Sequence, residues 1–161
     1  MLILIKYGNK RGNLAMSKYT DRAIKLFMEG KNCSQAVFAA FAPDLGLSEE
    51  MALAISVGLG GGVGRMREVC GAVSGSAMVV GLKYPELDKT EVYEKVRLIA
   101  DKFKKTNHSI ICKELLGLVE AEKSSTPEAR TPEYYQKRPC VKIVEDAVLA
   151  TEKVLFAGEI E

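Results

Sequence analysis

The chain has 161 residues, the length of a single domain with its own hydrophobic core, and 47% hydrophobic and 27% charged residues exclude an intrinsically disordered chain. The formal net charge of +2 gives no electrostatic basis for binding nucleic acid or a membrane surface. A single histidine, His108, leaves little material for a histidine-based metal site or a Ser-His-Asp triad.

Residues 1–15 are expected to form an N-terminal extension and residues 16–161 a folded domain, because the first amphipathic pattern begins just after Met16. Met16 is therefore an alternative start to Met1. The apolar run at residues 1–5 is too short for the core of a secretory signal peptide. No uninterrupted stretch reaches the roughly 18 apolar residues that cross a bilayer. These features predict a cytoplasmic protein without membrane insertion.

The first part of the chain has the periodicity of amphipathic helices. A first helix is predicted over residues 17–29. Asn32 can cap a second helix, which Pro43 ends, because proline cannot continue a helix interior. Ser48 can cap a third helix, which runs to about Val57.

A glycine-rich loop at residues 58–64 precedes a buried helix predicted over residues 70–82. The loop lacks the lysine of a Walker A motif and follows no strand, which argues against dinucleotide binding. Successive glycines can turn their N–H groups inward as an anion-binding nest, although a tight connection between helices would also use them. In the helix, Gly71 and Gly75 would let another backbone or a cofactor approach closely, at a cost of about 1 kcal/mol each relative to alanine.

The second half of the chain contains one long helix, two short helices and a final helix. The long helix ends at about Lys105, the first short segment ends near Gly117, and a polar exposed loop follows at residues 120–131. No strand pair and no internal repeat is evident, so the sequence predicts an all-α fold, a compact multi-helix single domain. The start signals of these four helices are Asp88, Ser109, Thr131 and Pro139.

Each of the four cysteines is expected where a helix begins, and a helix N-terminus favours thiolate over thiol. In the cytoplasm, such cysteines are more typical of catalysis or metal binding than of structural disulfides. There is no CxxC motif, but four helix starts can still converge in space. The alternative is that they fill the core, because free cysteine is a common small buried residue. The four are Cys33, Cys70, Cys112 and Cys140.

The sequence around Cys70 resembles the signature of the C_GCAxxG_C_C family. Residues 60–75 are Gly-Gly-Gly-Val-Gly-Arg-Met-Arg-Glu-Val-Cys-Gly-Ala-Val-Ser-Gly, and the other cysteines occur in the expected order in Asn-Cys-Ser-Gln-Ala, Cys-Lys-Glu-Leu-Leu-Gly and Arg-Pro-Cys. The resemblance covers about residues 17–157. The family comprises small redox-active proteins, and a similar four-cysteine domain occurs in split-Soret cytochromes, where an iron–sulfur site is suspected. The resemblance implies redox chemistry at the cysteines and supplies no substrate.

Three functional hypotheses follow. In the preferred one, Cys33, Cys70, Cys112 and Cys140 converge to hold an iron–sulfur cluster, or zinc if iron is absent, for electron transfer or redox sensing. The second is a thiol–disulfide oxidoreductase that uses a reversible cysteine pair. The third is a non-enzymatic helical accessory protein with structural cysteines. The residues expected to cover a cofactor are Gly60, Gly61, Gly62, Gly64, Arg65, Glu68 and Gly71, and the cations expected to offset thiolate charge are Lys31, Arg65, Arg67, Lys113 and Arg138.

The remaining expectations concern partners and single side chains. We expect a redox partner protein and no nucleic acid, and the sequence leaves open whether the chain forms homo-oligomers. Arg65 and Glu68 lie three residues apart and could form a pair that orients the glycine loop. His108 could assist a metal or tune Cys112, but its surroundings are more typical of a solvated helix end.

Overall fold

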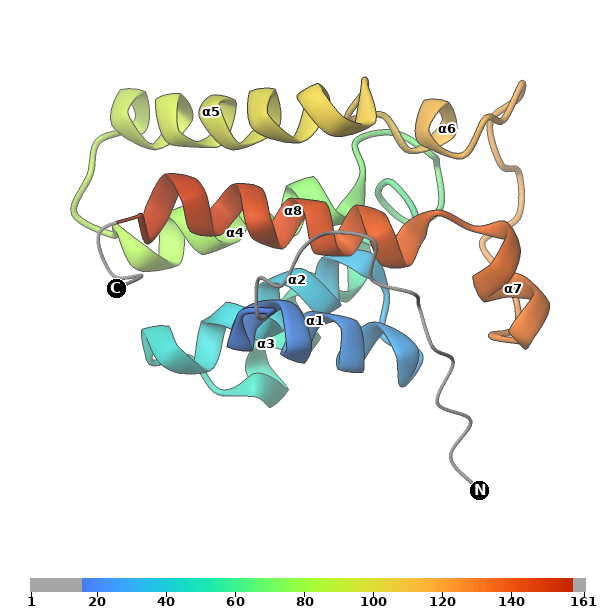
Figure 1. Ribbon diagram of the computed structural model, residues 1–161, viewed down its shortest axis with the longest axis horizontal. Coiled ribbons are helices and arrows are strands. Elements are labelled where there is room, and N and C mark those ends of the chain that lie inside the picture. Colours follow the sequence, from blue (N-terminus) through green and yellow to red (C-terminus); the bar gives the residue numbers. More distant parts are fainter. Residues whose placement is uncertain (1–15, 158–161) are drawn as a thin grey trace.

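The computed structural model describes residues 16–157, which contain eight α-helices and two short 3-10 helices (Figure 1). The predicted extension at residues 1–15 lies outside the described residues. Within residues 16–157 there is no strand, and a single isolated bridge pairs Val69 with Ile111. The predicted all-α fold is therefore confirmed. No helix in this part of the chain is long and apolar enough to cross a membrane.

The first three helices begin at the predicted capping residues. The Ser17 hydroxyl accepts the backbone N–H of Thr20, and Asn32 forms a reciprocal capping box with Gln35. The Ser48 hydroxyl accepts a backbone N–H in the same way. The elements are α1 (Lys18–Met28), α2 (Cys33–Phe41), the 3-10 helix Ala42–Leu45, α3 (Glu49–Ser56) and the 3-10 helix Val57–Leu59.

The later helices also follow the predicted order, with one difference at α6. Ser109 does not cap α6. Its hydroxyl accepts the N–H of Ile111, which is itself the N-cap residue, and the helix begins at Cys112. Asp88 caps α5 and Thr131 caps α7, as predicted. The elements are α4 (Gly71–Lys83), α5 (Lys89–Asn107), α6 (Cys112–Leu115), α7 (Pro132–Lys137) and α8 (Cys140–Leu155).

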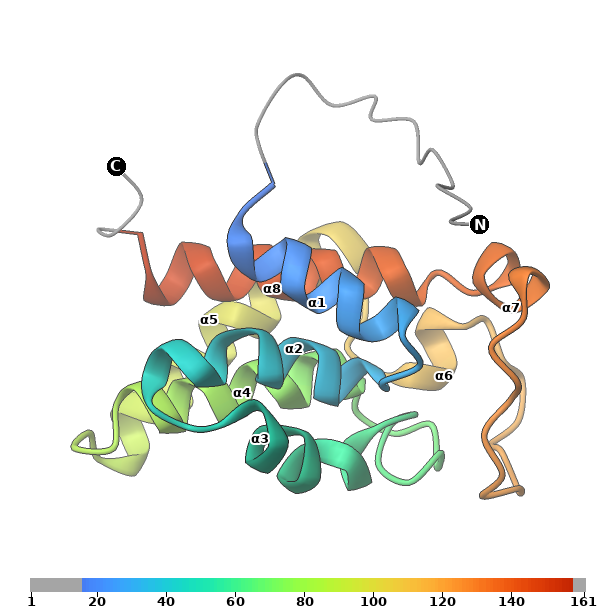
Figure 2. The same cartoon turned by 90° about the horizontal axis from the view of Figure 1, so that it is seen from below.

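The long helices pack around α8 and α2. In Figure 1, α5 lies along one side of α8, α1 to α3 lie on its other side, and α4 lies behind it. Figure 2 shows the order α8, α1, α2, α3 from one face to the other. The fully buried side chains between these helices include Phe27, Phe41, Ile99, Phe103 and Val144. Their removal from water supplies the main drive for folding.

The closest helix contact joins α2 to α4 and depends on the two glycines noted in the sequence. A Cβ atom added at Gly75 would lie 2.9 Å from the Ser34 carbonyl oxygen. A Cβ atom added at Gly71 would lie 2.6 Å from the Cys33 sulfur. Real Cβ atoms do not approach so closely, so these glycines let the start of α4 lie directly on the start of α2.

Candidate redox site

The starts of α2, α4, α6 and α8 meet at one cavity of about 340 Å³, and all four cysteines line it. Cys33, Cys112 and Cys140 are the first residues of their helices, and Cys70 is the residue just before α4. The predicted placement of the cysteines at helix starts is therefore confirmed. All four thiols are free.

Cys33 and Cys70 are in contact. The Cys70 thiol lies within hydrogen-bonding reach of the Cys33 sulfur, and this hydrogen bond lowers the pKa of Cys33 from 9.0 to about 6. The backbone N–H groups of Gly61 and Ser34 also donate to the Cys33 sulfur and lower its pKa further against the effect of burial. Cys70 in turn retains its proton, because donation to Cys33 and burial raise its pKa well above 9.0. The contact therefore favours a state of the pair with one thiolate and one thiol.

Cys112 and Cys140 have surroundings that favour the protonated form. Burial raises the pKa of Cys112, although an Arg67 guanidinium nitrogen 3.8 Å from its sulfur opposes this. Burial raises the pKa of Cys140 to about 12, and repulsion from the Cys33 thiolate, and from Cys112 once that thiol has ionised, adds to the effect. The two halves of the cysteine set thus differ in charge, although they line the same cavity.

The four sulfur atoms do not form the tight ligand group of a single metal ion. Within the part of the chain that the structure describes, no three histidine, cysteine, aspartate or glutamate side chains come together in that way. The zinc alternative expected from the sequence therefore gains no support. The chemistry of the donor set, four thiols in one cavity among arginines, still suits an iron–sulfur cluster.

The glycine loop has a compact left-handed backbone. Gly61, Gly62 and Gly64 have positive φ values, and so do three residues with side chains, which are Val63, Arg65 and Arg67. The backbone N–H groups of residues 63–68 all donate to carbonyl groups of residues 58–63. These donors are therefore used inside the loop, as a tight connection between helices requires. The N–H of Gly61 remains directed at the Cys33 sulfur.

The residues expected to cover a cofactor divide into two groups. Four of them line the cavity, and they are Gly60, Gly61, Gly64 and Arg65. The other three do not line it, but two of them permit close packing at a cysteine. A Cβ atom added at Gly62 would lie 2.7 Å from the Cys112 Cβ atom, and Gly71 lies against Cys33. Glu68 is exposed, and its carbonyl oxygen accepts the N–H of Cys112 at 2.7 Å.

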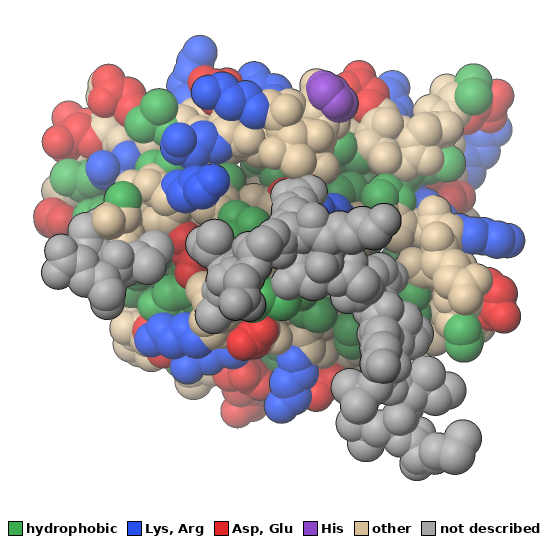
Figure 3. All heavy atoms as spheres, in the orientation of Figure 1, with side chains coloured by type: hydrophobic (Ala, Val, Ile, Leu, Met, Phe, Trp, Pro, Cys, Tyr) green, Lys and Arg blue, Asp and Glu red, His purple; other side chains and the backbone are tan. Residues whose placement is uncertain are grey.

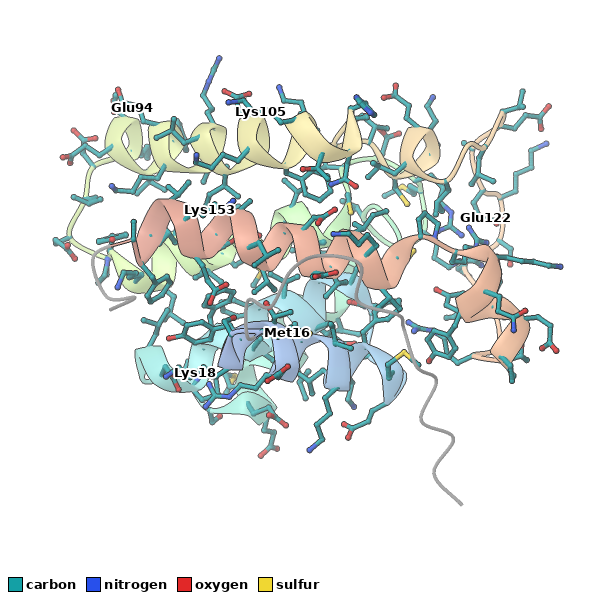
Figure 4. The ribbon with its side chains drawn as sticks, viewed as in Figure 1. Met16, Lys18, Glu94, Lys105, Glu122 and Lys153 are labelled. Atoms are coloured by element: carbon teal, nitrogen blue, oxygen red, sulfur yellow. The ribbon has the colours of Figure 1, made fainter. Side chains whose placement is uncertain are left out.

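Arg65 connects the glycine loop to the strap, which we define as the non-helical residues 118–131. Its guanidinium donates to the Ser124 carbonyl oxygen at 2.9 Å and to that of Thr126. It also pairs with the Glu122 carboxylate at 3.1 Å and does not pair with Glu68, so the expected Arg65–Glu68 pair is wrong. Glu122, labelled in Figure 4, lies at the end of the molecule where α6 and α7 are found.

Two further arginines line the cavity from the side of α7. Arg138 pairs with the Glu128 carboxylate. Arg130 donates to the carbonyl oxygens of Phe27 at 3.1 Å and Lys31 at 3.0 Å. Its guanidinium also lies over the Phe27 ring, 4.4 Å from the centroid. Sequence reasoning missed Arg130, because no local pattern links this loop residue to the cysteines.

The other charged candidates lie away from the cavity lining. Lys31 and Lys113 were expected to offset thiolate charge, but neither lines the cavity. His108 is an exposed residue at the end of α5, as the solvated alternative predicted, and Figure 3 shows the single histidine on the surface. The cations of the site are therefore arginines, whose guanidinium groups stay charged when buried.

Comparison with known proteins identifies the family. The model described as "Putative redox-active protein (C_GCAxxG_C_C)" matches residues 31–154, a range that includes all four cysteines. No curated protein and no solved structure matches the chain significantly. Because the matched range covers most of the sequence, the chain belongs to the C_GCAxxG_C_C family of redox-active proteins.

Proposed function

We propose that this protein is a thiol–disulfide redox protein whose reacting pair is Cys33 and Cys70. The observation that carries the proposal is the contact between the two thiols where the start of α4 lies directly on the start of α2, and the lowered pKa of Cys33 supports it. A thiolate is the attacking species in disulfide exchange, and a pKa near ambient pH gives the best compromise between thiolate fraction and nucleophilicity. Cys33 also lines the cavity, which gives a reactant access to its sulfur.

The exchange reaction uses both cysteines in turn. The Cys33 thiolate attacks one sulfur of a substrate disulfide, forms a mixed disulfide and releases the first substrate thiolate. Cys70 gives its proton to that thiolate and attacks the Cys33 sulfur, which expels the second substrate thiolate. The protein loses two electrons as the Cys33–Cys70 disulfide forms, and the substrate disulfide gains them. A reducing compartment such as the cytoplasm would return the pair to the dithiol form.

Single serine variants test this function. Reduced protein is exposed to a limiting amount of a small disulfide, and the remaining free thiols are counted. We expect Cys33→Ser and Cys70→Ser each to abolish the loss of two thiols. Cys112→Ser and Cys140→Ser are the matched controls and should retain it. The proposal would be overturned if the Cys33→Ser and Cys70→Ser variants still lost two thiols and the two control variants did not.

An iron–sulfur cluster is the second candidate function, because all four cysteines line one cavity together with four arginines. Cys33, Cys70, Cys112 and Cys140 would hold the cluster, and the arginines Arg65, Arg67, Arg130 and Arg138 would offset the negative charge of the thiolate ligands. A bound cluster would supply one-electron transfer, and its potential would depend on these charges and on solvent exposure. The placement of the thiols in a shared cavity also argues against cysteines that only fill the core.

Iron and acid-labile sulfide, measured per chain on protein purified without oxygen, separate the two functions. The cluster function predicts stoichiometric iron and sulfide, and their loss in every one of the four serine variants. The dithiol function predicts metal-free protein with four titratable thiols, even after attempted reconstitution. Cys112→Ser and Cys140→Ser are decisive, because only the cluster function requires these two residues.

A further inference from the structure

The cavity beside the reacting pair carries more positive than negative charge. Among residues 16–157, four arginines line it, and Glu128 is the acidic residue in the same lining. Glu122 lies close by and pairs with Arg65 at 3.1 Å. Two carboxylates and the Cys33 thiolate therefore face four guanidinium groups, and the excess of positive charge in a partly enclosed cavity attracts anions.

Arg67 is a buried cation with unused hydrogen-bonding capacity. Its side chain is 8% exposed, and its Nε–H has no hydrogen-bond partner in the described structure. Its remaining contacts are long, at 3.8 Å to the Cys112 sulfur and 3.8 Å to the Glu122 carboxylate. A buried charged donor left unpaired is costly, so a ligand that accepts from it would be strongly favoured.

Arg130 is the second cation without an acidic partner. Within the described residues it donates to two backbone carbonyl groups, those of Phe27 and Lys31, and pairs with no carboxylate. The Phe27 and Tyr134 rings flank its guanidinium, at 4.4 and 4.8 Å from their centroids. These contacts fix the guanidinium at the cavity wall while leaving its charge uncompensated.

The cavity volume limits what can reach these two arginines. About 340 Å³ lies at the lower end of the range of about 300–1,000 Å³ that is typical of small-molecule pockets. We propose that the cavity binds a low-molecular-weight disulfide carrying carboxylate groups, with Arg67 and Arg130 receiving the carboxylates beside the Cys33–Cys70 pair. This inference rests on the proposed thiol–disulfide function and names its substrate class.

The chemistry needs no further reactant. The bound disulfide is the oxidant, and the reduced Cys33–Cys70 pair is the reductant. One substrate half leaves when the Cys33–substrate S–S bond forms, and the other leaves when the Cys33–Cys70 bond replaces it. One released thiolate takes the Cys70 proton and the other takes a proton from water, so two carboxylate-bearing thiols leave the cavity.

The test compares three small disulfides of similar length and different charge. Dithiodipropionate carries two carboxylates, bis-hydroxyethyl disulfide is neutral, and cystamine carries two ammonium groups. The rate at which each oxidises the reduced protein is divided by its rate with dithiothreitol, which removes differences in intrinsic reactivity. At low ionic strength we expect a normalised rate about tenfold higher for dithiodipropionate than for the neutral disulfide, with cystamine slowest, and a smaller spread at high salt.

Two further measurements test whether the cavity binds the carboxylates and whether Arg67 and Arg130 receive them. Suberate, a dicarboxylate of the same chain length without sulfur, should slow oxidation by dithiodipropionate competitively, and octanediol should not. Arg130→Gln and Arg67→Gln should each remove most of the preference for the dianion. Arg97→Gln, at an exposed position on α5 outside the cavity, is the matched control and should keep it. If Arg67→Gln does not fold, the disulfide series and Arg130→Gln still decide the question.

The outcomes separate the two levels of the proposal. Equal normalised rates for the three disulfides, or no effect of suberate, would overturn the anionic substrate and leave the dithiol function in place. If none of the three reagents forms the Cys33–Cys70 disulfide, the dithiol function fails and the substrate class fails with it. A dianion preference that Arg97→Gln abolishes and Arg130→Gln retains would also overturn the assignment.

Discussion

The Cys33–Cys70 pair and the other two cysteines, Cys112 and Cys140, line the same cavity but are held there by different means. The pair is fixed by direct contact between the starts of α2 and α4, where a Cβ atom at Gly71 would clash with the Cys33 sulfur. Cys112 and Cys140 lie beside arginines, close to the loop and the strap. Backbone packing therefore fixes the position of the reacting pair, and charged side chains determine the electrostatic surroundings of the other two cysteines.

The largest expected effect concerns the protonation of Cys33. We expect the rate of Cys33 alkylation by iodoacetamide to reach half its maximum near pH 6, against 9.0 for an ordinary cysteine. In Cys70→Ala the midpoint should move upward, because the principal hydrogen-bond donor to the thiolate is lost. Alkylation of Cys33 followed by mass spectrometry across pH gives both curves. A wild-type midpoint near pH 9 would contradict the lowered pKa of Cys33.

The same lowered pKa predicts how stability depends on pH. A group whose pKa is lower in the folded than in the unfolded chain stabilises the fold above its unfolded pKa, and this stabilisation is lost as the pH falls through the folded pKa. The free energy of unfolding of the reduced protein should therefore rise between about pH 6 and pH 9 through Cys33. Urea unfolding at several pH values measures this slope, and Cys33→Ser should flatten it.

The next largest effect tests the role of backbone packing at the pair. Gly71→Ala would place a Cβ atom 2.6 Å from the Cys33 sulfur and 2.8 Å from the Leu59 carbonyl oxygen. Because the neighbouring backbone must move, we expect a loss of about 1–3 kcal/mol in the free energy of unfolding and weaker Cys33–Cys70 exchange. Urea unfolding and thiol counting check the two expectations.

Gly81→Ala is the matched control on the same helix. Gly81 has no atom within 4 Å of an added Cβ, so alanine should stabilise α4 by up to about 1 kcal/mol. Equal effects at the two glycines would show that the start of α4 does not lie directly on the start of α2. The comparison is sharp because the chemical change is identical.

A smaller, local effect is expected in the strap, which Arg65 holds by an ion pair and hydrogen bonds. Arg65→Gln removes the ion pair to Glu122 and shortens the side chain that reaches Ser124 and Thr126. We expect amide hydrogen exchange in the strap to accelerate about tenfold, the change that follows from about 1.4 kcal/mol of local stability. Exchange in α2 and α4 should stay unchanged. Faster exchange throughout the protein would contradict a strap held separately from the helix bundle.

The smallest effect concerns the left-handed loop. Val63 has a φ of 60°, a conformation that a β-branched residue adopts only at a cost. We expect Val63→Gly to increase the free energy of unfolding by about 0.5–1 kcal/mol, because the relief of strain exceeds the extra flexibility of the unfolded chain. Thermal unfolding measures the change. A destabilisation of similar size would show that the Val63 side chain contributes more by packing than its backbone costs.

Local signals in the sequence predicted the helices and the position of each cysteine within them. Asn32 with Gln35 and Asp88 with Glu91 cap helices through contacts three residues apart, which any reader of the sequence can find. The placement of cysteines at helix starts follows from those boundaries. The close approach at Gly71 was also foreseen, although the sequence could not name Cys33 as the atom that comes close.

The remaining features of the site depend on contacts between segments far apart in the sequence, which local patterns do not predict. The chain separates Arg130 from its acceptors on Phe27 and Lys31 by about a hundred residues, and no local pattern records this contact. The sequence also left open which N–H groups of the glycine loop face an anion: those of residues 63–68 donate to carbonyl groups inside the loop, and that of Gly61 is directed at the Cys33 sulfur. The sequence likewise ranked the four cysteines as equals, whereas burial and hydrogen bonding make Cys33 a thiolate and Cys140 a thiol.

Disulfide mapping tests the central claim most directly. Reduced protein is oxidised with one equivalent of a small disulfide, the remaining thiols are alkylated, and the cross-linked peptides are identified by mass spectrometry. The account predicts a Cys33–Cys70 cross-link, with Cys112 and Cys140 recovered as alkylated thiols. A cross-link between Cys112 and Cys140, or four alkylated thiols after oxidation, would contradict it.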